Sequence, residues 1–230
     1  MPTIQEGTAE PIVVSWSGGK DSALALDALS RDPELQVVGL LTSVTSTYDR
    51  VSVHGVRRSM LEAQVERLGL PLFEIPLSPN CSNEAYEAAF HSALDEIRRE
   101  RPDVTRIAFG DLFLEDIRNY REVFLARHNM RALFPVWKRD TTSFIKEFIE
   151  LGFKAVVTCV DSRMLDQSFA GRMIDNEFVS ALPGNVDPCG ENGEFHSFVV
   201  DGPMFAEPLR FSWGETVSRN SFWFRDLLPQ

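Results

Sequence analysis

Six consecutive residues near the start of the chain have the types and spacing to hold the phosphates of a nucleotide. The segment Ser17–Ser22 (SGGKDS) follows the apolar run Ile12–Trp16 and precedes a stretch rich in alanine and leucine. Two adjacent glycines let backbone N–H groups approach an anion that a Cβ would push away. The start of the following helix adds unpaired N–H groups, and Lys20 adds a mobile positive charge. We therefore predict a phosphate-binding turn between a first strand and a first helix that begins at Asp21 or Ser22.

The spacing of this segment excludes two commoner nucleotide-binding loops. A Walker loop needs four residues between its first glycine and its Gly-Lys pair, and the dinucleotide fingerprint needs three spaced glycines. Neither fits Ser17–Ser22. The alternative is an ordinary tight turn with Ser22 as the helix N-cap. The six-residue pattern at a strand–helix junction favours the phosphate-binding interpretation.

The elements that must position this turn alternate between strand and helix. Apolar runs bounded by Gly and Pro predict strands, and apolar residues at helical spacing predict helices. Such alternation is typical of an α/β fold with a doubly wound, mostly parallel sheet, in which ligands collect at the carboxyl ends of the strands. Three polar segments lie at such ends: Ser17–Ser22, Thr42–Ser43 and Gly110–Asp111. The expected elements after the first helix are a strand at Leu35–Thr42, a helix from Val56 to Leu68, a strand at Leu72–Leu77, a helix at Ser82–Glu100, a strand at Val104–Phe109, a helix at Ile117–His128 and a strand at Ala132–Val136.

The pattern changes near Pro135–Asp140, which predicts a boundary between residues 1–137 and a smaller C-terminal α+β domain at 138–230. The expected elements of the second domain are a helix at Thr141–Leu151, a strand at Phe153–Val160, a helix near Gln167–Leu182, a strand at Phe195–Val200 and edge strands within Leu209–Leu227.

A second candidate site lies at Cys189–His196 (CGENGEFH), just before a predicted strand. Glu191 and Glu194 flank Asn192-Gly193, so their carboxylates are suited to hold Mg²⁺, a substrate cation or ammonium. The alternative is a solvated turn, because Asn-Gly is a frequent turn dipeptide. The residues alone favour that turn slightly.

Composition narrows the functional classes. The 230 residues carry 23 basic and 34 acidic side chains, a net charge of −11, which argues against a broad nucleic-acid-binding surface. Three cysteines without metal-ligand spacing indicate a reducing compartment. The first residues lack a signal-peptide core and no apolar run is long enough to cross a bilayer. We expect a cytoplasmic enzyme without a membrane partner.

The segment Ser17–Ser22 resembles the PP-loop of the ATP pyrophosphatases. Together with Gly190–Pro203 it is similar to the diphthine–ammonia ligase family, and the likeness covers nearly the whole chain, including Pro135–Asp140 and Leu165–Arg172. Two positions depart from the family pattern: Asn192 replaces a glycine and His196 replaces a glutamate. The segments His54–Arg57 and Gly110–Asp116 resemble bacterial members of this family.

The resemblance implies a HUP-like, Rossmann-type PP-loop domain followed by a C-terminal substrate-binding domain. It also implies that ATP and Mg²⁺ activate a carboxylate, diphthine or a related small or protein-borne acid, as an acyl-adenylate. Ammonia then displaces AMP to form an amide. No amidotransferase domain fits beside the two predicted domains, so free ammonium is the expected nitrogen source.

The resemblance, together with the positions of His54, Arg118 and Arg121 after predicted strands, gives each candidate residue an expected role. The expected catalytic residues are Lys20, Asp21, Glu191 and Glu194, with Asp21 also as the protein ligand of Mg²⁺. The expected nucleotide-binding residues are Ser15, Trp16, Ser17, Gly18, Gly19, Lys20, Asp21, Ser22, Leu41, Thr42, His54 and Gly110. The expected acceptor-binding residues are Asp111, Arg118, Arg121, Gly190, Asn192, Gly193 and His196, although an arginine-bearing helix face is commonly just solvated.

Two other functions compete with an amide ligase. A PP-loop enzyme that modifies tRNA predicts a basic face, an RNA-binding domain or paired sulfur-carrying cysteines, none of which the sequence contains. A non-catalytic sensor of adenine nucleotides predicts binding without turnover. A homodimer is compatible with the sequence, but no pattern requires one.

Overall fold

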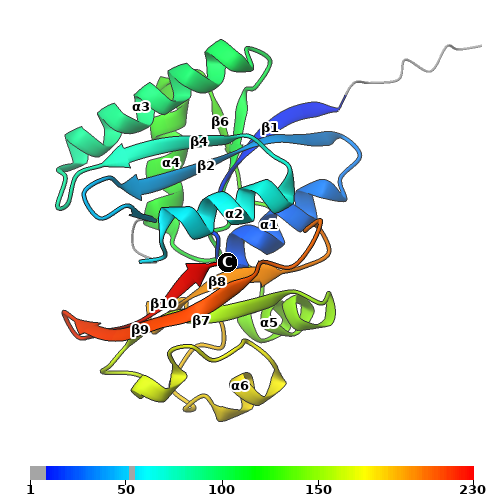
Figure 1. The fold of residues 1–230 in the computed structure, drawn as a ribbon. Coiled ribbons are helices and arrows are strands. Elements are labelled where there is room, and N and C mark those ends of the chain that lie inside the picture. Colours follow the sequence, from blue (N-terminus) through cyan, green and yellow to red (C-terminus); the bar gives the residue numbers. More distant parts are fainter. Residues whose placement is uncertain (1–8, 52–54) are drawn as a thin grey trace, which may run out of the picture.

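The computed structural model describes residues 9–51 and 55–230, which form two β-sheets with helices packed around them (Figure 1). The larger sheet has the order β3-β2-β1-β5-β6, and β4 also pairs with β2. All of its strand pairs are parallel except β2 with β3. Its strands are β1 (Glu10–Ser15), β2 (Leu35–Thr45), β3 (Arg50–Val51), β4 (Leu72–Leu77), β5 (Arg106–Ala108) and β6 (Arg131–Leu133).

Helices cover both faces of the larger sheet. One face packs its buried side chains against α1 (Lys20–Ser30) and α2 (Arg58–Leu68). The opposite face packs against α3 (Asn83–Glu100) and α4 (Glu115–Arg127). Alternate residues of β1 divide between the two cores, since Ile12 and Val14 belong to the first and Val13 to the second. The predicted doubly wound, mostly parallel sheet is therefore confirmed.

The second sheet is antiparallel throughout, with the order β8-β7-β10-β9. Its strands are β7 (Lys154–Asp161), β8 (Phe195–Asp201), β9 (Phe211–Arg219) and β10 (Phe222–Pro229). The helices of this part are α5 (Thr141–Glu150), the short 3₁₀ helix η1 (Gln167–Phe169) and α6 (Asn176–Ala181). This arrangement confirms a C-terminal α+β part, whereas the exact boundary at 137/138 stays a prediction.

The two sheets share one hydrophobic core. Ala23 and Leu24 of α1 belong to the same buried cluster as Phe198 and Val199 of β8. Figure 1 shows α1 and α2 lying between the two sheets. The backbone is joined directly as well, because the Val199 N–H donates to the Gly18 carbonyl over 2.8 Å. The turn that precedes α1 is thus fixed against β8.

The helix expected near Gln167–Leu182 is wrong as a continuous element. Gly171 has a φ of +95°, which ends the helical path after η1. The Gly171 N–H donates to the Val157 carbonyl, and the Val157 N–H donates to the Arg172 carbonyl, over 2.8 and 2.9 Å. These tertiary backbone bonds to β7 outweigh the apolar spacing, and only α6 remains helical.

Two strand predictions also need correction. β2 continues to Thr45 rather than ending at Thr42, because its last residues pair with β4 and with the unexpected strand β3. β10 lies between β7 and β9, so it is an interior strand and not an edge strand. Within the described residues, no helix is both long enough and apolar enough to cross a membrane.

Candidate functional site

A cavity of about 690 Å³ lies between the carboxyl ends of β1 and β5 and the loop that leads into β8. We call it the nucleotide cavity, after the ligand that the sequence predicts for it. Most predicted site residues line it, namely Ser15, Ser17, Lys20, Asp21, Ser22, Gly110, Asp111, Arg121, Gly190, Glu191, Asn192, Gly193 and His196. Leu114, Phe195 and Ser197 complete the lining. The segments that the sequence placed about 170 residues apart thus meet at one site.

The turn Ser17–Ser22 leaves the start of α1 open. The helix begins at Lys20, and its N-cap, Gly19, has no side chain that could cap it. The Lys20 N–H donates to the Ser197 hydroxyl over 3.3 Å, whereas no side chain of the described residues is bonded to the N–H groups of Asp21 and Ser22. Ser22 is not the N-cap, since its hydroxyl donates to the Gly19 carbonyl over 2.9 Å. The Ser17 hydroxyl lies 3.2 Å from that of Ser22 and accepts a hydrogen bond from the Gly19 N–H. The remaining N–H groups of the first turn and the positive end of the helix dipole make this turn suited to bind an anion.

Two glycines are required by the packing of this turn. Gly18 has a φ of +78°, and a Cβ there would lie 2.8 Å from both the Gln64 amide oxygen and the Phe198 ring. Gly110 lies at the end of β5, where a Cβ would come within 2.8 Å of the Asp21 backbone. Both contacts are shorter than side chains tolerate. The turn therefore approaches α2 and β8 at Gly18, and the segment after β5 approaches the start of α1 at Gly110, more closely than any larger residue allows.

Lys20 is the central cation of the cavity. Its side chain is only 5% exposed and its Nζ lies 2.9 Å from Asp21 Oδ1 and 3.7 Å from Glu191 Oε1. Burial by itself would lower the pKa of Lys20. The neighbouring acidic groups, Asp21 first, raise it by more than burial lowers it, so the pKa lies well above its usual value. Lys20 is therefore charged at any physiological pH.

Three carboxylates share the cavity with this lysine. Burial, together with the nearby charge of Asp21, raises the pKa of Glu191 to about 7, and Lys20 offsets this rise only in part. Burial also raises the pKa of Asp111, which forms an ion pair of 3.1 Å with Arg121. The site therefore holds one carboxyl group that exchanges its proton near neutral pH, a property suited to acid–base chemistry.

Glu194 does not line the cavity but organises the loop that does. Its carboxylate accepts hydrogen bonds from the Asp187 N–H at 3.0 Å and from the backbone and side-chain nitrogens of Asn192 at 2.9 and 3.0 Å. Burial acts to raise the pKa of Glu194, but these donors lower it below its usual value. The role supported by this geometry is to hold Glu191 opposite Lys20.

Several predicted residues lie elsewhere. Trp16 is buried, and its indole N–H donates to Gln64 over 2.7 Å. Leu41 and Thr42 are buried within β2 and do not line the cavity. Arg118 pairs with Glu122 at 2.8 Å and lies over the Trp137 ring, outside the lining. His54 falls outside the described residues.

Gln64 is a site residue that the sequence reasoning did not single out. It is completely buried, and its amide nitrogen donates to the carbonyls of Gly18 and Val199 over 3.1 and 2.7 Å. It therefore ties α2 to the phosphate-binding turn and to β8. The sequence did carry a signal for this role, because the Gln64 amide lies four residues from both Met60 and Leu68 on the predicted apolar face of the helix. A polar side chain buried on such a face needs hydrogen-bond partners.

The acidic groups do not form a ready-made metal cage. Among residues 9–51 and 55–230, no three His, Cys, Asp or Glu side chains are grouped to hold a metal ion. Mg²⁺ commonly needs only one or two carboxylates when substrate phosphates supply its other ligands. Asp21 and Asp111 face the same cavity and fit that smaller requirement.

Comparison with known proteins identifies the family. Residues 11–132 match the diphthamide synthase N-terminal domain, and residues 140–227 match the diphthamide synthase C-terminal domain. The chain belongs to the diphthamide synthase family. The resemblance predicted from the two motifs is confirmed.

Relatives in this family are distant but extensive. A diphthine–ammonia ligase from Danio rerio is 24% identical and one from Bos taurus is 22% identical, over 87% and 89% of this chain and 86% and 84% of their own lengths. A protein of the same name from Schizosaccharomyces pombe is 21% identical over 89% of this chain, which spans 36% of that relative. These relatives are eukaryotic, so the resemblance to bacterial members stays a prediction.

Proposed function

We propose that this protein is an ATP-dependent carbon–nitrogen ligase that joins ammonia to the carboxylate of diphthine or of a related acid. The family and its diphthine–ammonia ligases support an enzyme of this kind. The observation that carries the proposal is the meeting of the N-terminus of α1, the buried Lys20 and the Glu191 carboxyl group in one cavity.

ATP is proposed to place its outer phosphates on the turn Ser17–Ser22. The α1 N-terminus and Lys20 would stabilise the negative charge that develops on pyrophosphate when the acceptor carboxylate attacks the α-phosphorus. That attack forms an acyl-adenylate and breaks the bond between the α- and β-phosphates. The Ser17 hydroxyl is placed to donate to the same phosphates. The Ser22 hydroxyl, 3.2 Å away, would first have to release the Gly19 carbonyl.

Mg²⁺ would accompany ATP, held by Asp21 with Asp111 beside it. When bound, the ion would neutralise phosphate charge. Asp21 lines the cavity and pairs with Lys20, so its carboxylate lies where the phosphates would bring the ion.

Glu191 is proposed to handle protons in the second half-reaction. Ammonium must lose a proton before its nitrogen can attack the acyl-adenylate carbonyl and displace AMP. A carboxyl group with a pKa of about 7 is substantially ionised at neutral pH yet more basic than an ordinary glutamate. Glu191 lies in the lining with Asn192 and His196, which we assign to the acceptor together with Gly190, Gly193, Asp111 and Arg121.

The two parts of the chain would then divide the work. Residues 1–137 supply the nucleotide-binding turn, and residues 138–230 supply the loop with Glu191. Arg118 stays outside this assignment, because its guanidinium is held by Glu122 and by the Trp137 ring.

A direct test supplies ATP, Mg²⁺, ammonium and a panel of carboxylates that includes diphthine, and measures AMP, pyrophosphate and the mass of the acceptor. We expect AMP and pyrophosphate in equal amounts, and a mass change that corresponds to replacement of a hydroxyl by an amino group. Formation of ADP would contradict the proposal. Turnover that depends on tRNA, or tight ATP binding without turnover of any acceptor, would instead favour the tRNA-modifying enzyme or the sensor.

A further inference from the structure

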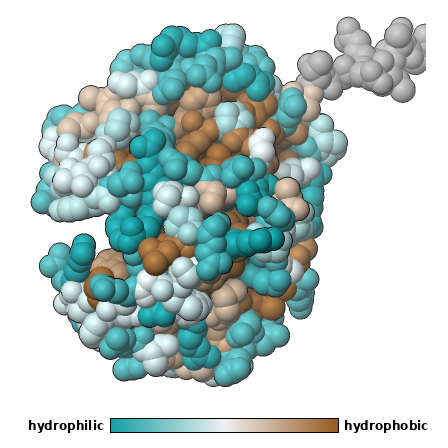
Figure 2. Space-filling model, viewed as in Figure 1, coloured by the Kyte–Doolittle hydropathy of each residue, from teal (hydrophilic) through white to brown (hydrophobic). Residues whose placement is uncertain are grey.

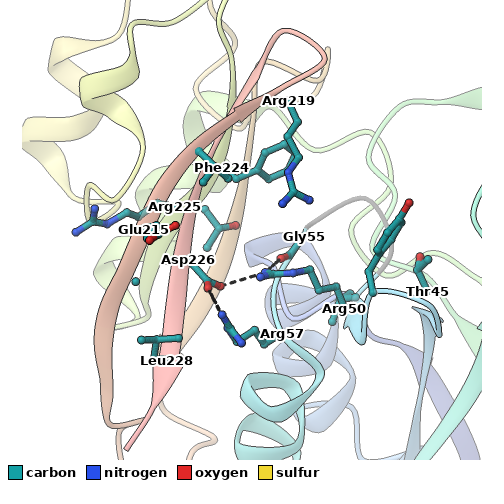
Figure 3. A pocket seen from close by; sticks show the side chains of 15 residues that line it. Thr45, Arg50, Gly55, Arg57, Glu215, Arg219, Phe224, Arg225, Asp226 and Leu228 are labelled. Atoms are coloured by element: carbon teal, nitrogen blue, oxygen red, sulfur yellow. Dashed lines mark hydrogen bonds and ion pairs between the residues drawn. The ribbon is translucent and has the colours of Figure 1, made fainter.

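A second cavity, of about 580 Å³, lies between residues 45–51 with 55–57 on one side and the β9–β10 hairpin on the other. We call it the arginine cavity; its main polar side chains are Arg50, Arg57, Arg219 and Asp226 (Figure 3). It shares no lining residue with the nucleotide cavity. The space-filling view is hollowed on its left side, between the parts of the surface that carry these two segments (Figure 2). A volume of this size is ordinary for a small-molecule site.

The lining of the arginine cavity is cationic although the protein is acidic. Four arginines and two carboxylates line it, whereas the whole chain has a net charge of −11. Arg50 and Arg57 point toward the centre from one side and Arg219 from the other, while Arg225 extends away (Figure 3). The three inward arginines face a single inward aspartate, so the interior favours an anionic ligand.

Asp226 fixes two of these arginines. Its carboxylate accepts hydrogen bonds from Arg50 Nη1 at 3.0 Å and from Arg57 Nε and Nη2 at 2.9 and 2.6 Å. Burial acts to raise the pKa of Asp226, but these arginine hydrogen bonds lower it below its usual value. Each guanidinium has five N–H donors, so both arginines keep donors for a ligand while their orientation is held.

Arg219 and the apolar wall complete the site. Within the described residues the Arg219 side chain has no hydrogen-bond or ion-pair partner, and it reaches into the cavity beside Phe224 (Figure 3). Phe224, Val217 and Leu228 line the cavity, and the ring of Tyr48 is 60% exposed at its edge. Such surfaces pack against the flat or apolar body of a ligand whose charged group meets the arginines.

We propose that the arginine cavity is a second ligand site, which binds a small molecule with a carboxylate or phosphate on an aromatic or apolar body. The proposal does not depend on the ligase reaction. The two cavities nevertheless adjoin, because Thr158 of the arginine cavity lies 3.5 Å, Oγ1 to O, from the carbonyl of His196 in the nucleotide cavity.

Calorimetric titration tests the proposal with phenyl phosphate and benzoate as probes. The nucleotide cavity is first saturated with α,β-methylene-ATP, so that phosphate binding there does not contribute. We expect saturable binding of at least one probe, and its preference identifies the anionic group. Benzyltrimethylammonium, which has a ring and a positive charge, should not bind. Absence of saturable binding by both anions, or equal binding of the cation, would overturn the proposal.

Matched variants locate the bound probe. Arg219→Gln should weaken binding by about tenfold or more, the effect expected from loss of one charge-assisted contact. Arg210→Gln is the control, because Arg210 is exposed just before the other end of β9 and lines neither cavity. Equal affinity in Arg219→Gln and wild type would contradict the assignment.

A third variant separates this inference from the proposed function. Lys20→Ala should weaken binding of α,β-methylene-ATP and leave phenyl phosphate binding unchanged. If Lys20→Ala abolishes binding of the probe as well, the probe occupies the nucleotide cavity and the second site is wrong. If the nucleotide does not bind to wild type but the probe does, the proposed function fails and the second site stands.

Discussion

The nucleotide cavity and the arginine cavity differ in the type of their cations and in how those cations are balanced by carboxylates. In the nucleotide cavity a single buried lysine lies among carboxylates, and its charge is already balanced before a ligand arrives. In the arginine cavity the guanidinium groups outnumber the carboxylates, and one aspartate fixes two of them. Lysine is a flexible point charge that exchanges partners, whereas arginine holds a planar fork in one orientation. The nucleotide cavity is therefore suited to a reaction in which Lys20 exchanges one anionic partner for another. The arginine cavity is suited to bind an anion with guanidinium groups that are already in position.

ATP binding in the nucleotide cavity must disturb the ion pairs of Lys20. Phosphates that reach Lys20 must compete with Glu191, which lies 3.7 Å from the lysine Nζ, and with Asp21 at 2.9 Å. Loss of the Lys20 contact would leave Glu191 beside other negative charges, which favours its protonated form. Nucleotide binding and the protonation of Glu191 are thus coupled in this arrangement.

The largest expected effect is that of Lys20→Ala. Removal of one preorganised donor to a developing negative charge commonly slows catalysis by about 10²–10³-fold, and we expect AMP formation to fall by this factor. Steady-state measurement of pyrophosphate release checks it. Lys154→Ala is the control, since that lysine is 61% exposed and pairs with Asp201 away from both cavities. Equal activity in the two variants would remove Lys20 from the mechanism.

The next effect concerns stability and acts on the other cavity. Asp226→Asn removes the acceptor that holds Arg50 and Arg57, and we expect it to lower the free energy of unfolding by about 1.5–3 kcal/mol. Urea denaturation measures this change. Asp103→Asn, in an exposed pair with Arg101, should change the free energy of unfolding much less, because water screens that pair. If both variants cost the same, the aspartate does not preorganise the arginine cavity.

The sequence predicted the nucleotide cavity much better than the arginine cavity, for a physical reason. The turn Ser17–Ser22 is one contiguous segment, and its glycines and lysine together indicate phosphate binding. Arg50 and Arg57 face each other across a β-bridge, and they meet Asp226 only through tertiary packing. Arg219 and Asp226 are placed on the other side of the cavity by the pairing of β9 with β10. That pairing could not be inferred, since Leu209–Leu227 gave no signal for an interior strand.

The same limit applies within the nucleotide cavity. Trp16 was expected beside the nucleotide because it follows β1, but the indole turns into the core toward Gln64. The sequence placed Glu191 and Glu194 in equivalent positions around Asn-Gly. Only the fold separates them, since the donors of Asp187 and Asn192 hold Glu194 away from the cavity.

A smaller effect should appear in the pH dependence. If Glu191 accepts a proton during ammonia transfer, kcat/KM for ammonium should rise as pH increases through about 7. Glu191→Gln should lower the rate and remove this rise. A pH profile of the wild type that stays flat across this range would contradict the assignment.

Glu191 should also make stability depend on pH, in the opposite direction to the rate: stability should fall as pH rises. The folded protein binds more protons than the unfolded chain between the usual glutamate pKa of 4.5 and about 7, so Glu191 lowers stability as pH rises across that interval. Glu191→Gln should therefore raise the melting temperature relative to wild type at about pH 8 and change it little at about pH 4. Calorimetry at the two pH values separates this charge effect from a simple loss of packing.

The smallest effect is expected for Arg118→Gln, because Arg118 lines neither cavity. This variant shows how much a substitution outside both cavities changes activity and binding. Its guanidinium pairs with Glu122 one helical turn away and lies 4.8 Å from the centre of the Trp137 ring. Exposed pairs at this spacing contribute about 0.3–0.5 kcal/mol, so Arg118→Gln should change stability by little more than this amount. It should leave both AMP formation and phenyl phosphate binding unchanged, as measured by pyrophosphate release and calorimetry. A large loss of AMP formation would instead place Arg118 in the acceptor site, as the sequence first predicted, and would require α4 to move toward the nucleotide cavity when the acceptor binds.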